Sequence, residues 1–381
     1  MTTGLATKHW TKGKLQDLVF FQRGFDITQA QQTEGPVPVI SSSGVTSYHS
    51  EARATGPGVV IGRKGTLGSV HYSEVDYWPH DTTLWSKDLR GNNPRFVYFY
   101  LHTINFKRFD VGNSNPTLNR NHIHDLPALI PPWDTQTRIA DILSAYDDLI
   151  ENNRRRMALL EDAARQLYRE WFVRLRFPGH EHTRIVNGVP EGWERVPTPE
   201  AIEINPTTRL SDESEHWSVE MADLPIDSMV VQQATRREGR SGSKFRNGDT
   251  LFARITPCLE NGKTAFVDFL EDGETARGST EFIVLRGRRV TPEYVYCLAR
   301  THDFRGNAIK SMVGSSGRQR VQESCFEKFL VLIPTSTLLD LFTEYARPQF
   351  RQIKALHTQN QKLRAARDLL LPRLMSGEIA V

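Results

Sequence analysis

Cationic, hydroxyl and amide side chains gather in several turns of this sequence that also contain glycine. Arginine and lysine bind phosphate, the amides of asparagine and glutamine match the edge of adenine, and arginine also matches guanine. Turns of this composition therefore predict contacts with duplex DNA. In the first half of the chain the residues expected to make them are Ser42, Ser43, Tyr48, Arg63, Lys64, Asn113, Ser114, Asn115, Asn119 and Arg120.

The second half of the chain carries a larger set of the same kind. The segment "RREGRSGSK" at 236–244 predicts a mobile cationic loop that orders on phosphate, whereas "ARITPCLENGK" at 253–263 predicts two strands joined by an Asn-Gly turn. We expect Asn261 and Gln319 to read bases. The full set is Arg236, Arg237, Arg240, Lys244, Arg254, Thr256, Asn261, Lys263, Ser315, Ser316, Arg318, Gln319 and Arg320.

An ordinary solvated surface is the second interpretation of these cations. The 48 Lys and Arg residues are nearly balanced by 45 Asp and Glu residues, which leaves a formal net charge of +3. The positive charge is nevertheless clustered, as in "NRRRM" at 153–157 and "RGRR" at 286–289. Charge alone therefore leaves both solvation and phosphate binding open.

The sequence offers little for catalysis or for metal binding. The turn "GRKGTLG" at 62–68 lacks the Gly-Lys-Ser/Thr ending of a nucleotide-binding loop. The histidines of "HIH" at 122–124 and "GHEH" at 179–182 have no convincing further ligands, so they predict structural roles. Asp147 and Asp148 predict a solvated helix face. We expect no catalytic residue and no metal.

Two long helices are expected to position these turns. From 137 to 172, apolar residues recur at alternating spacings of four and three, which is typical of a coiled-coil seam. A similar helix runs from about 337 to 375. The seam residues are Ile139, Leu143, Tyr146, Ile150, Asn153, Leu160 and Leu167 in the first helix, and Ile353, Leu356, Asn360, Leu363 and Leu370 in the second.

The asparagines of the two seams predict how the helices pack. Antiparallel pairing of helices of similar length brings their middles together, so Asn153 should lie near Asn360. We expect Pro348 to kink the first turns of the second helix, and Pro372 with the Ser-Gly pair at 376–377 to end it.

The two halves of the chain repeat one plan. "NPRFVYFYL" at 93–101 resembles "TPEYVYCLA" at 291–299, and each precedes a polar turn and a long helix. Short β-rich runs alternate with turns and helices, which predicts an α+β fold of two mixed domains, joined by two long helices in an antiparallel coiled coil with a pseudo-twofold repeat. The predicted segments are a domain at 1–133, a helix at 134–178, a domain at 179–335 and a helix at 336–381.

The composition is typical of a folded chain. Its 381 residues are 38% hydrophobic and 24% charged, and no apolar run approaches a membrane span or a signal peptide. We expect a cytoplasmic protein without membrane contact. Cys258, Cys297 and Cys325 are too few and too widely spaced for a disulfide framework, so free thiols are predicted.

Three segments carry a resemblance to a known family. They are "TQTRIADILSAYDDLIENN" at 135–153, "ITPCLENGK" at 255–263 with "GSTEF" at 278–282, and "RDLLLPRLMSGEI" at 367–379. Together with the doubled plan, they resemble the specificity subunit of type I restriction–modification systems over nearly the whole chain.

The resemblance implies a DNA-binding subunit that performs no chemistry itself. Its globular parts would be target recognition domains, each reading one half of a split DNA sequence, and its coiled coil would set their separation. It would recruit two methyltransferase subunits and two restriction subunits; S-adenosylmethionine, ATP and Mg would bind to those partners, and no cofactor to this chain. A DNA-modifying or DNA-cleaving enzyme that acts alone, and an adaptor of another phage-defence system, remain alternatives.

Overall fold

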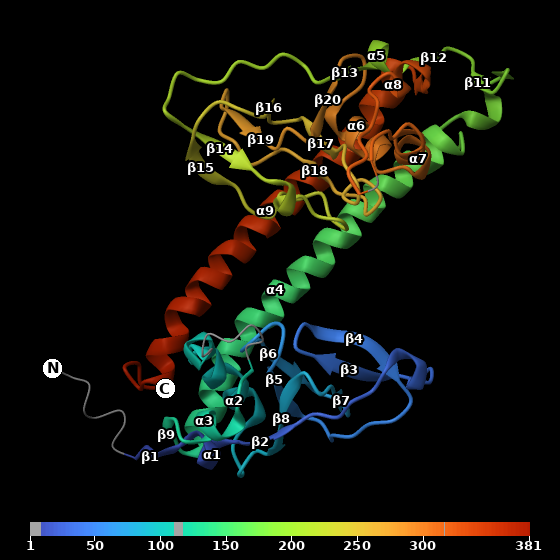
Figure 1. Ribbon diagram of the computed structural model, residues 1–381. Coiled ribbons are helices and arrows are strands. Elements are labelled where there is room, and N and C mark those ends of the chain that lie inside the picture. The colour runs from blue at the N-terminus through green and yellow to red at the C-terminus, as the bar shows by residue number, and fades with distance from the viewer. Residues whose placement is uncertain (1–8, 110–116, 316) are drawn as a thin grey trace. The chain divides into compact units, whose positions relative to one another are not determined.

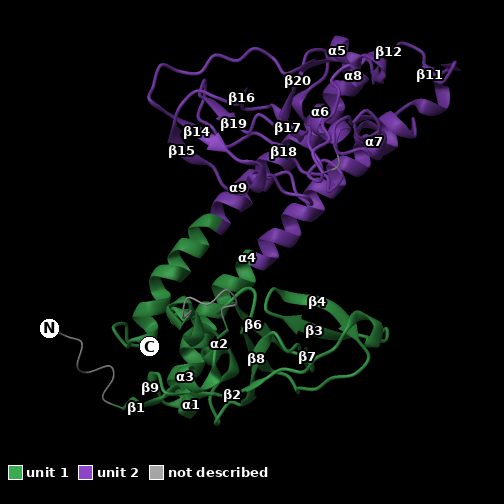
Figure 2. Ribbon diagram, viewed as in Figure 1, with its two compact units in different colours: residues 1–150, 361–381 green, residues 151–360 purple. Residues whose placement is uncertain are grey.

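The computed structural model describes residues 9–109, 117–315 and 317–381 (Figure 1). It divides into two compact units, unit 1 with Met1–Ile150 and Gln361–Val381, and unit 2 with Glu151–Asn360 (Figure 2). The boundaries fall inside the two long helices, so each helix contributes one part to each unit.

Unit 1 contains three small sheets. A four-stranded sheet has the order β2-β8-β5-β6, a three-stranded sheet has the order β4-β3-β7, and β1 pairs with β9. The strands are β1 (Thr11–Lys14), β2 (Phe20–Arg23), β3 (Val37–Ser41), β4 (Gly44–His49), β5 (Gly58–Gly62), β6 (Val70–Ser73), β7 (Trp78–Pro79), β8 (Thr83–Asp88) and β9 (Pro127–Ile130).

One helix covers the four-stranded sheet of unit 1. The helix α2 (Pro94–His102) begins at a capping residue, Asn93, whose side chain accepts hydrogen bonds from two backbone N–H groups of the first turn. Its buried aromatic and aliphatic side chains share a core with β5, which is buried along its whole length. The short helices α1 (Leu15–Leu18) and α3 (Arg120–His124) close the same core.

Unit 2 repeats this order of strands. Its sheets have the orders β13-β20-β17-β18 and β15-β14-β19-β16, and β12 pairs with β21. The inner pair of the second sheet is parallel, β14 with β19, as β3 is with β7 in unit 1. The strands are β10 (Ile185–Val186), β11 (Val189–Pro190), β12 (Glu194–Pro197), β13 (Ile202–Ile204), β14 (Glu215–Val219), β15 (Thr235–Glu238), β16 (Ser243–Arg246), β17 (Thr250–Ala253), β18 (Thr264–Phe266), β19 (Thr275–Gly278), β20 (Phe282–Gly287) and β21 (Leu330–Ile333).

The helices of unit 2 follow the same plan. The helix α6 (Pro292–Ala299) contacts β17 and β20 and corresponds in order to α2. The helix α7 (His302–Lys310) follows it, and the short helices α5 (Thr198–Ala201) and α8 (Cys325–Lys328) pack against one another. The α+β class predicted from the sequence is thus confirmed in each unit.

The two long helices run antiparallel within unit 2. The helix α4 (Trp133–Tyr168) continues into a π turn, and α9 spans Ser336–Met375. Asn153 Nδ2 donates to Asn360 Oδ1 at 2.9 Å, which confirms the predicted proximity of these side chains. Toward the end of α4, Tyr168 packs on Phe342 near the start of α9, with ring centroids 6.1 Å apart.

Unit 1 holds the opposite ends of the same helices. Ile139 and Leu143, near the start of α4, share a buried cluster with Leu374 at the end of α9. Asp147 forms an ion pair with Arg367, so the prediction that this carboxylate belongs to a merely solvated face is wrong. The hydrophobic pattern identified the seam but not this charged pair beside it.

All the predicted seam residues are buried or half-buried. The helix α9 continues through Pro348 without a break. It ends at Met375, three residues beyond Pro372 and directly before the Ser-Gly pair at 376–377, which was predicted to end it together with that proline. Packing of its apolar face compensates for the backbone hydrogen bond that each internal proline removes. At the end of α9, Gly377 adopts a φ of 71° and donates its N–H to the Leu374 carbonyl at 3.2 Å.

Two further features of the described residues bear on the sequence predictions. Cys258, Cys297 and Cys325 are free. In the part of the chain that the structure describes, none of the helices combines the length and the apolar character needed to cross a membrane.

Candidate nucleic-acid interface

Several turns of unit 1 that were predicted to contact DNA lie together. The turn between β3 and β4 contains Ser42 and Ser43, and the Ser42 carbonyl accepts a hydrogen bond from the Ser69 hydroxyl in the loop after β5. The Ser42 N–H donates to Thr82 Oγ1 at 3.3 Å. Tyr48, on the neighbouring strand β4, is 60% exposed.

Three backbone hydrogen bonds join these turns around Arg63. The N–H groups of Arg63 and Lys64 donate to the Thr82 carbonyl at 2.8 and 3.1 Å, and Leu118 N–H donates to the Arg63 carbonyl at 2.9 Å. We call this arrangement of Thr82, Arg63 and Leu118 the first clasp. It places "GRKGTLG" beside the end of "GNSNPTLNR", which the sequence alone did not predict.

The Arg63 side chain is partly desolvated. Its Nη1 atom is buried and, among the described residues, has no hydrogen-bond partner. Burial lowers the pKa of Arg63, Arg23 lowers it further, and Asp81 opposes both effects. Asp81 in turn forms an ion pair with Arg23 at 2.9 Å. The Arg63 guanidinium therefore retains a donor for which the described residues supply no acceptor.

The residues next to the first clasp have different environments. Asn119 is the N-cap of α3, and its side chain accepts the Asn121 N–H at 3.0 Å, so its carbonyl oxygen already has a structural partner. Arg120 is exposed. Asn113, Ser114 and Asn115 lie outside the described residues.

Unit 2 contains the same arrangement. Arg254 N–H donates to the Glu281 carbonyl at 3.0 Å, and Val321 N–H donates to the Arg254 carbonyl at 2.9 Å. We call this arrangement of Glu281, Arg254 and Val321 the second clasp. Thr256 N–H also donates to the Gln319 carbonyl at 3.0 Å. The two segments predicted to read DNA in this half are thus joined by their backbones.

Ion pairs surround the second clasp. Arg320 binds both carboxylate oxygens of Glu281, with Nε–O distances of 2.9 Å. This pairing lowers the pKa of Glu281. Arg254 Nη1 lies 3.4 Å from Glu323, while its Nε is buried and, within the described ranges, has no hydrogen-bond partner. Arg254 thus shares with Arg63 both its place in the clasp and an unsatisfied donor.

The loop after Val313 supplies the remaining predicted contacts of this region. Val313 and Arg320 exchange backbone hydrogen bonds at 3.0 Å, and Arg318 N–H donates to the Ser315 carbonyl at 3.0 Å. Ser315 and Arg318 are exposed and Gln319 is half-buried. Ser316 lies outside the described residues.

The connection from β17 to β18 differs from the predicted Asn-Gly hairpin turn. The strands do pair antiparallel, but residues 254–263 join them through successive turns, among them Asn261 N–H to Pro257 O at 3.0 Å. Asn261 is exposed. Lys263 instead points inward, because its Nζ donates to the Met221 carbonyl at 2.7 Å. This bond competes with the DNA contact predicted for Lys263.

The prediction of a mobile loop at 236–244 is wrong for most of that segment. Arg236 and Arg237 lie on β15, and Lys244 lies on β16. Arg236 pairs with Glu274 at 2.8 Å and lies over Trp217, and Arg237 pairs with Glu220 at 2.9 Å. Arg240 Nη2 donates to the Leu210 carbonyl at 3.3 Å, and Lys244 Nζ to the Gly242 carbonyl at 3.2 Å. Carboxylates distant in sequence hold the arginines, and local composition could not reveal them.

Sequence reasoning missed the carboxylates beside both clasps. Asp81 and Glu281 each hold an arginine, Arg23 in unit 1 and Arg320 in unit 2. The internal repeat could have indicated the region, because Glu281 and Thr82 occupy the same position in the two clasps.

The described residues contain a single candidate metal site. Ligand atoms of Asp26, His80 and Asp81 lie within 4.8 Å of one another, but Arg23 already neutralises Asp81. In "HIH", His124 is buried, and its Nε2 accepts a hydrogen bond from the Phe21 N–H at 3.0 Å, as in a structural histidine.

The sequence is similar to those of known DNA specificity subunits. Residues 7–162 match the model of the type I restriction modification DNA specificity domain. The specificity subunit of the type I restriction enzyme MjaIX, from Methanocaldococcus jannaschii, is 22% identical over 306 residues, which cover 75% of this chain and 69% of that protein. The EcoEI specificity subunit, from Escherichia coli, is 28% identical over 158 residues, 39% of this chain and 26% of that protein.

The fold is also similar to that of a solved structure. The S subunit of a type I restriction-modification system from M. genitalium aligns with a TM-score of 0.59 and 13% identity, and the alignment covers 96% of each chain.

Proposed function

We propose, for a chain that belongs to the family of type I restriction–modification specificity subunits, that its two units each read one half of a split DNA sequence. The observation that carries this proposal is the repetition of the clasp. Arg63 and Arg254 hold equivalent places, each with polar turns beside it and with a buried donor that has no partner among the described residues. Two separate copies of one reading surface suit a site that is read in two parts.

The long helices would act as the spacer between the two readings. Ser336–Met375 is a helix of 40 residues, and at 1.5 Å per residue such a helix extends over roughly 60 Å. The helical repeat of B-DNA is about 34–36 Å. An antiparallel coiled coil of this length can therefore hold two DNA-reading surfaces far enough apart to contact successive turns of the duplex. If a pseudo-twofold axis relates the two clasps, both would face the DNA in the same orientation.

The same helices offer surface for partner subunits. Within unit 1, Leu149 is 48% exposed and Leu369 is 71% exposed; within unit 2, Leu159 is 70% exposed. Exposed leucines on long helices favour packing against further helices. We propose that methyltransferase subunits, and with them restriction subunits, bind this chain in the cytoplasm, two of each. S-adenosylmethionine, ATP and Mg would be bound by those partners.

The experiment that tests this function measures methyl transfer with and without partners. The purified chain, DNA and labelled S-adenosylmethionine should give no transfer, and addition of the methyltransferase subunit of the same system should give transfer at one split sequence. Transfer by the chain alone would support an enzyme that acts independently. Methylome sequencing of the host should show the split motif disappear when the gene is removed.

A further inference from the structure

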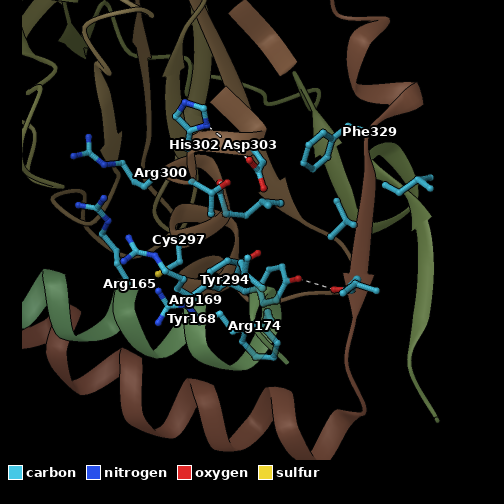
Figure 3. A pocket seen from close by; sticks show the side chains of 17 residues that line it. Arg165, Tyr168, Arg169, Arg174, Tyr294, Cys297, Arg300, His302, Asp303 and Phe329 are labelled. Carbon is cyan, nitrogen blue, oxygen red and sulfur yellow. Dashed lines mark hydrogen bonds and ion pairs between the residues drawn. The ribbon is translucent and has the colours of Figure 1, made fainter. Parts of the chain in front are cut away.

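Unit 2 contains a basic pocket that shares no residue with the second clasp. Its walls come from the end of α4 with the π turn, from the α6–α7 junction and from β21 (Figure 3). It has a volume of about 570 Å³, within the range of roughly 300–1,000 Å³ that is usual for binding pockets.

Positive charge dominates the lining. Arg165, Arg169, Arg174 and Arg300 line the pocket, and Asp303 is the one acidic side chain among its described lining residues. Arg169 is exposed, and its side chain makes no ion pair or hydrogen bond with the described parts of the chain. This guanidinium is therefore available to a carboxylate from outside.

The other arginines are only partly neutralised. Arg174 shares the carboxylate of Glu170 with Arg176, which lies 3.5 Å from it. Arg165 lies 3.8 Å from the buried Glu161. The oxygens of Glu161 already accept hydrogen bonds from the Tyr296 hydroxyl at 2.6 Å and from a backbone N–H at 2.8 Å. Internal carboxylates thus leave a net positive rim.

Apolar side chains lie beside these cations. Val173 is 49% exposed and Leu330 is 52% exposed, and both line the pocket. The buried rings of Tyr168 and Tyr294 lie beneath, and the Tyr294 hydroxyl is satisfied by the Leu332 carbonyl at 2.6 Å. The floor therefore offers carbon surface, while the rim offers N–H donors.

We propose that this pocket binds an acidic segment of the partner methyltransferase subunit, in which a leucine- or phenylalanine-sized side chain is flanked by carboxylates. The apolar side chain covers Val173 and Leu330, and the carboxylates pair with Arg169 and Arg165. Arginine is enriched in protein interfaces, and burial of the exposed aliphatic carbon beside it would stabilise the complex. The proposal rests on the proposed recruitment of that subunit and assigns it a contact point.

The test uses the full chain and the methyltransferase subunit of the same system. Two variants alter exposed lining residues. Arg169→Glu reverses a charge of the rim, and Leu330→Ser removes apolar surface. Arg184→Glu is the matched control, because Arg184 is an exposed arginine of unit 2 that does not line the pocket. We expect at least roughly tenfold weaker subunit binding for each pocket variant, unchanged binding for the control, and unchanged DNA binding by all three.

Hydrogen exchange on the wild-type complex provides a second measurement. Segments 169–174 and 329–332 should be protected when the partner binds. Equal subunit binding by both pocket variants would overturn the assignment while leaving recruitment intact. Weakened DNA binding with normal subunit assembly would also overturn it, and would make the pocket a DNA contact. Failure of the wild-type chain to bind the methyltransferase subunit would instead refute the proposed function itself.

Discussion

Arg63 and Arg254 occupy equivalent positions in the two clasps. Hydrogen bonds of both the N–H and the carbonyl group hold the backbone of each arginine in place. Each keeps one buried nitrogen without a partner among the described residues. We expect each side chain to turn toward DNA on binding, where the edge of guanine or a phosphate supplies the acceptor that the described residues lack.

The two arginines should affect different halves of the DNA site. Arg63→Ala should weaken discrimination at one half, and Arg254→Ala at the other, by about 1–3 kcal/mol each on the cognate duplex. Binding isotherms on duplexes altered in either half would measure this. If both substitutions relax the same half, the two clasps do not read separate parts of the site.

Arg236 and Arg237 should contribute affinity rather than sequence discrimination. Each must exchange a carboxylate partner for phosphate on binding, so their gain is smaller than that of free cations. The double alanine variant should weaken cognate and scrambled duplexes equally and reduce the salt slope by less than about two units. Gln319→Ala is the contrast, because it should weaken the cognate duplex alone. A double variant that loses only cognate binding would reverse these roles.

Asp268 should make unit 2 less stable as the pH rises. Burial raises its pKa to about 6, and Lys354 on α9 only partly opposes this. A folded-state pKa above the unfolded one means that the folded state binds the proton more tightly, so stability falls between pH about 4 and about 6 by at most roughly 1.4 kcal/mol per pH unit.

Asp268→Asn removes this penalty. The variant and the wild type should have equal free energies of unfolding near pH 4, and the variant should be more stable at pH 7. Denaturant unfolding across this range would measure the difference, with Asp272→Asn as an exposed control. Greater stability of the wild type at pH 7 would show that the Asp268 carboxylate is favourably paired.

At the scale of elements, periodicity predicted what depends on local spacing. The seams of α4 and α9, and the meeting of Asn153 with Asn360, follow from residues three and four apart on one face. The structure of 236–244 did not follow, because strand β15 is fixed by pairing with β14 and by carboxylates from distant segments. The clasps were likewise hidden, since backbone hydrogen bonds such as Leu118 to Arg63 leave no compositional signal.

The asparagine pair should set the register of α4 and α9 at a cost in stability. Asn153→Leu alone removes the 2.9 Å hydrogen bond and leaves Asn360 beside an apolar partner, which should lower stability by about 1–3 kcal/mol. Asn153→Leu combined with Asn360→Leu should recover or exceed the wild-type Tm. Thermal unfolding of the single and double variants would decide this. A double variant less stable than the single one would show that the pair is not interchangeable with apolar packing.

At the scale of the whole molecule, a chain that reads two separated half-sites depends on the length of its helices. If the chain has the proposed function, the length of its helices should therefore set the length of the unspecified part of the DNA sequence. Seven residues extend a helix by about 10 Å, or roughly three base pairs, and they preserve the apolar seam. Helix length can thus be varied without exposing the core.

Such heptads can be inserted in both helices, after Asn153 in α4 and before Asn360 in α9, so that the seams stay matched. Three base pairs also turn the duplex by roughly 100°, since B-DNA has about 10 base pairs per turn. One added heptad should therefore lengthen the spacer of the methylated motif but weaken binding, because the second half-site faces away. Three heptads add about 31 Å, close to one full turn, and should restore affinity at a spacer longer by roughly nine base pairs. Methylome sequencing of hosts that carry each variant would give the spacer, and binding isotherms would give the affinity. An unchanged spacer in every variant would mean that the helices do not set the distance between the two readings.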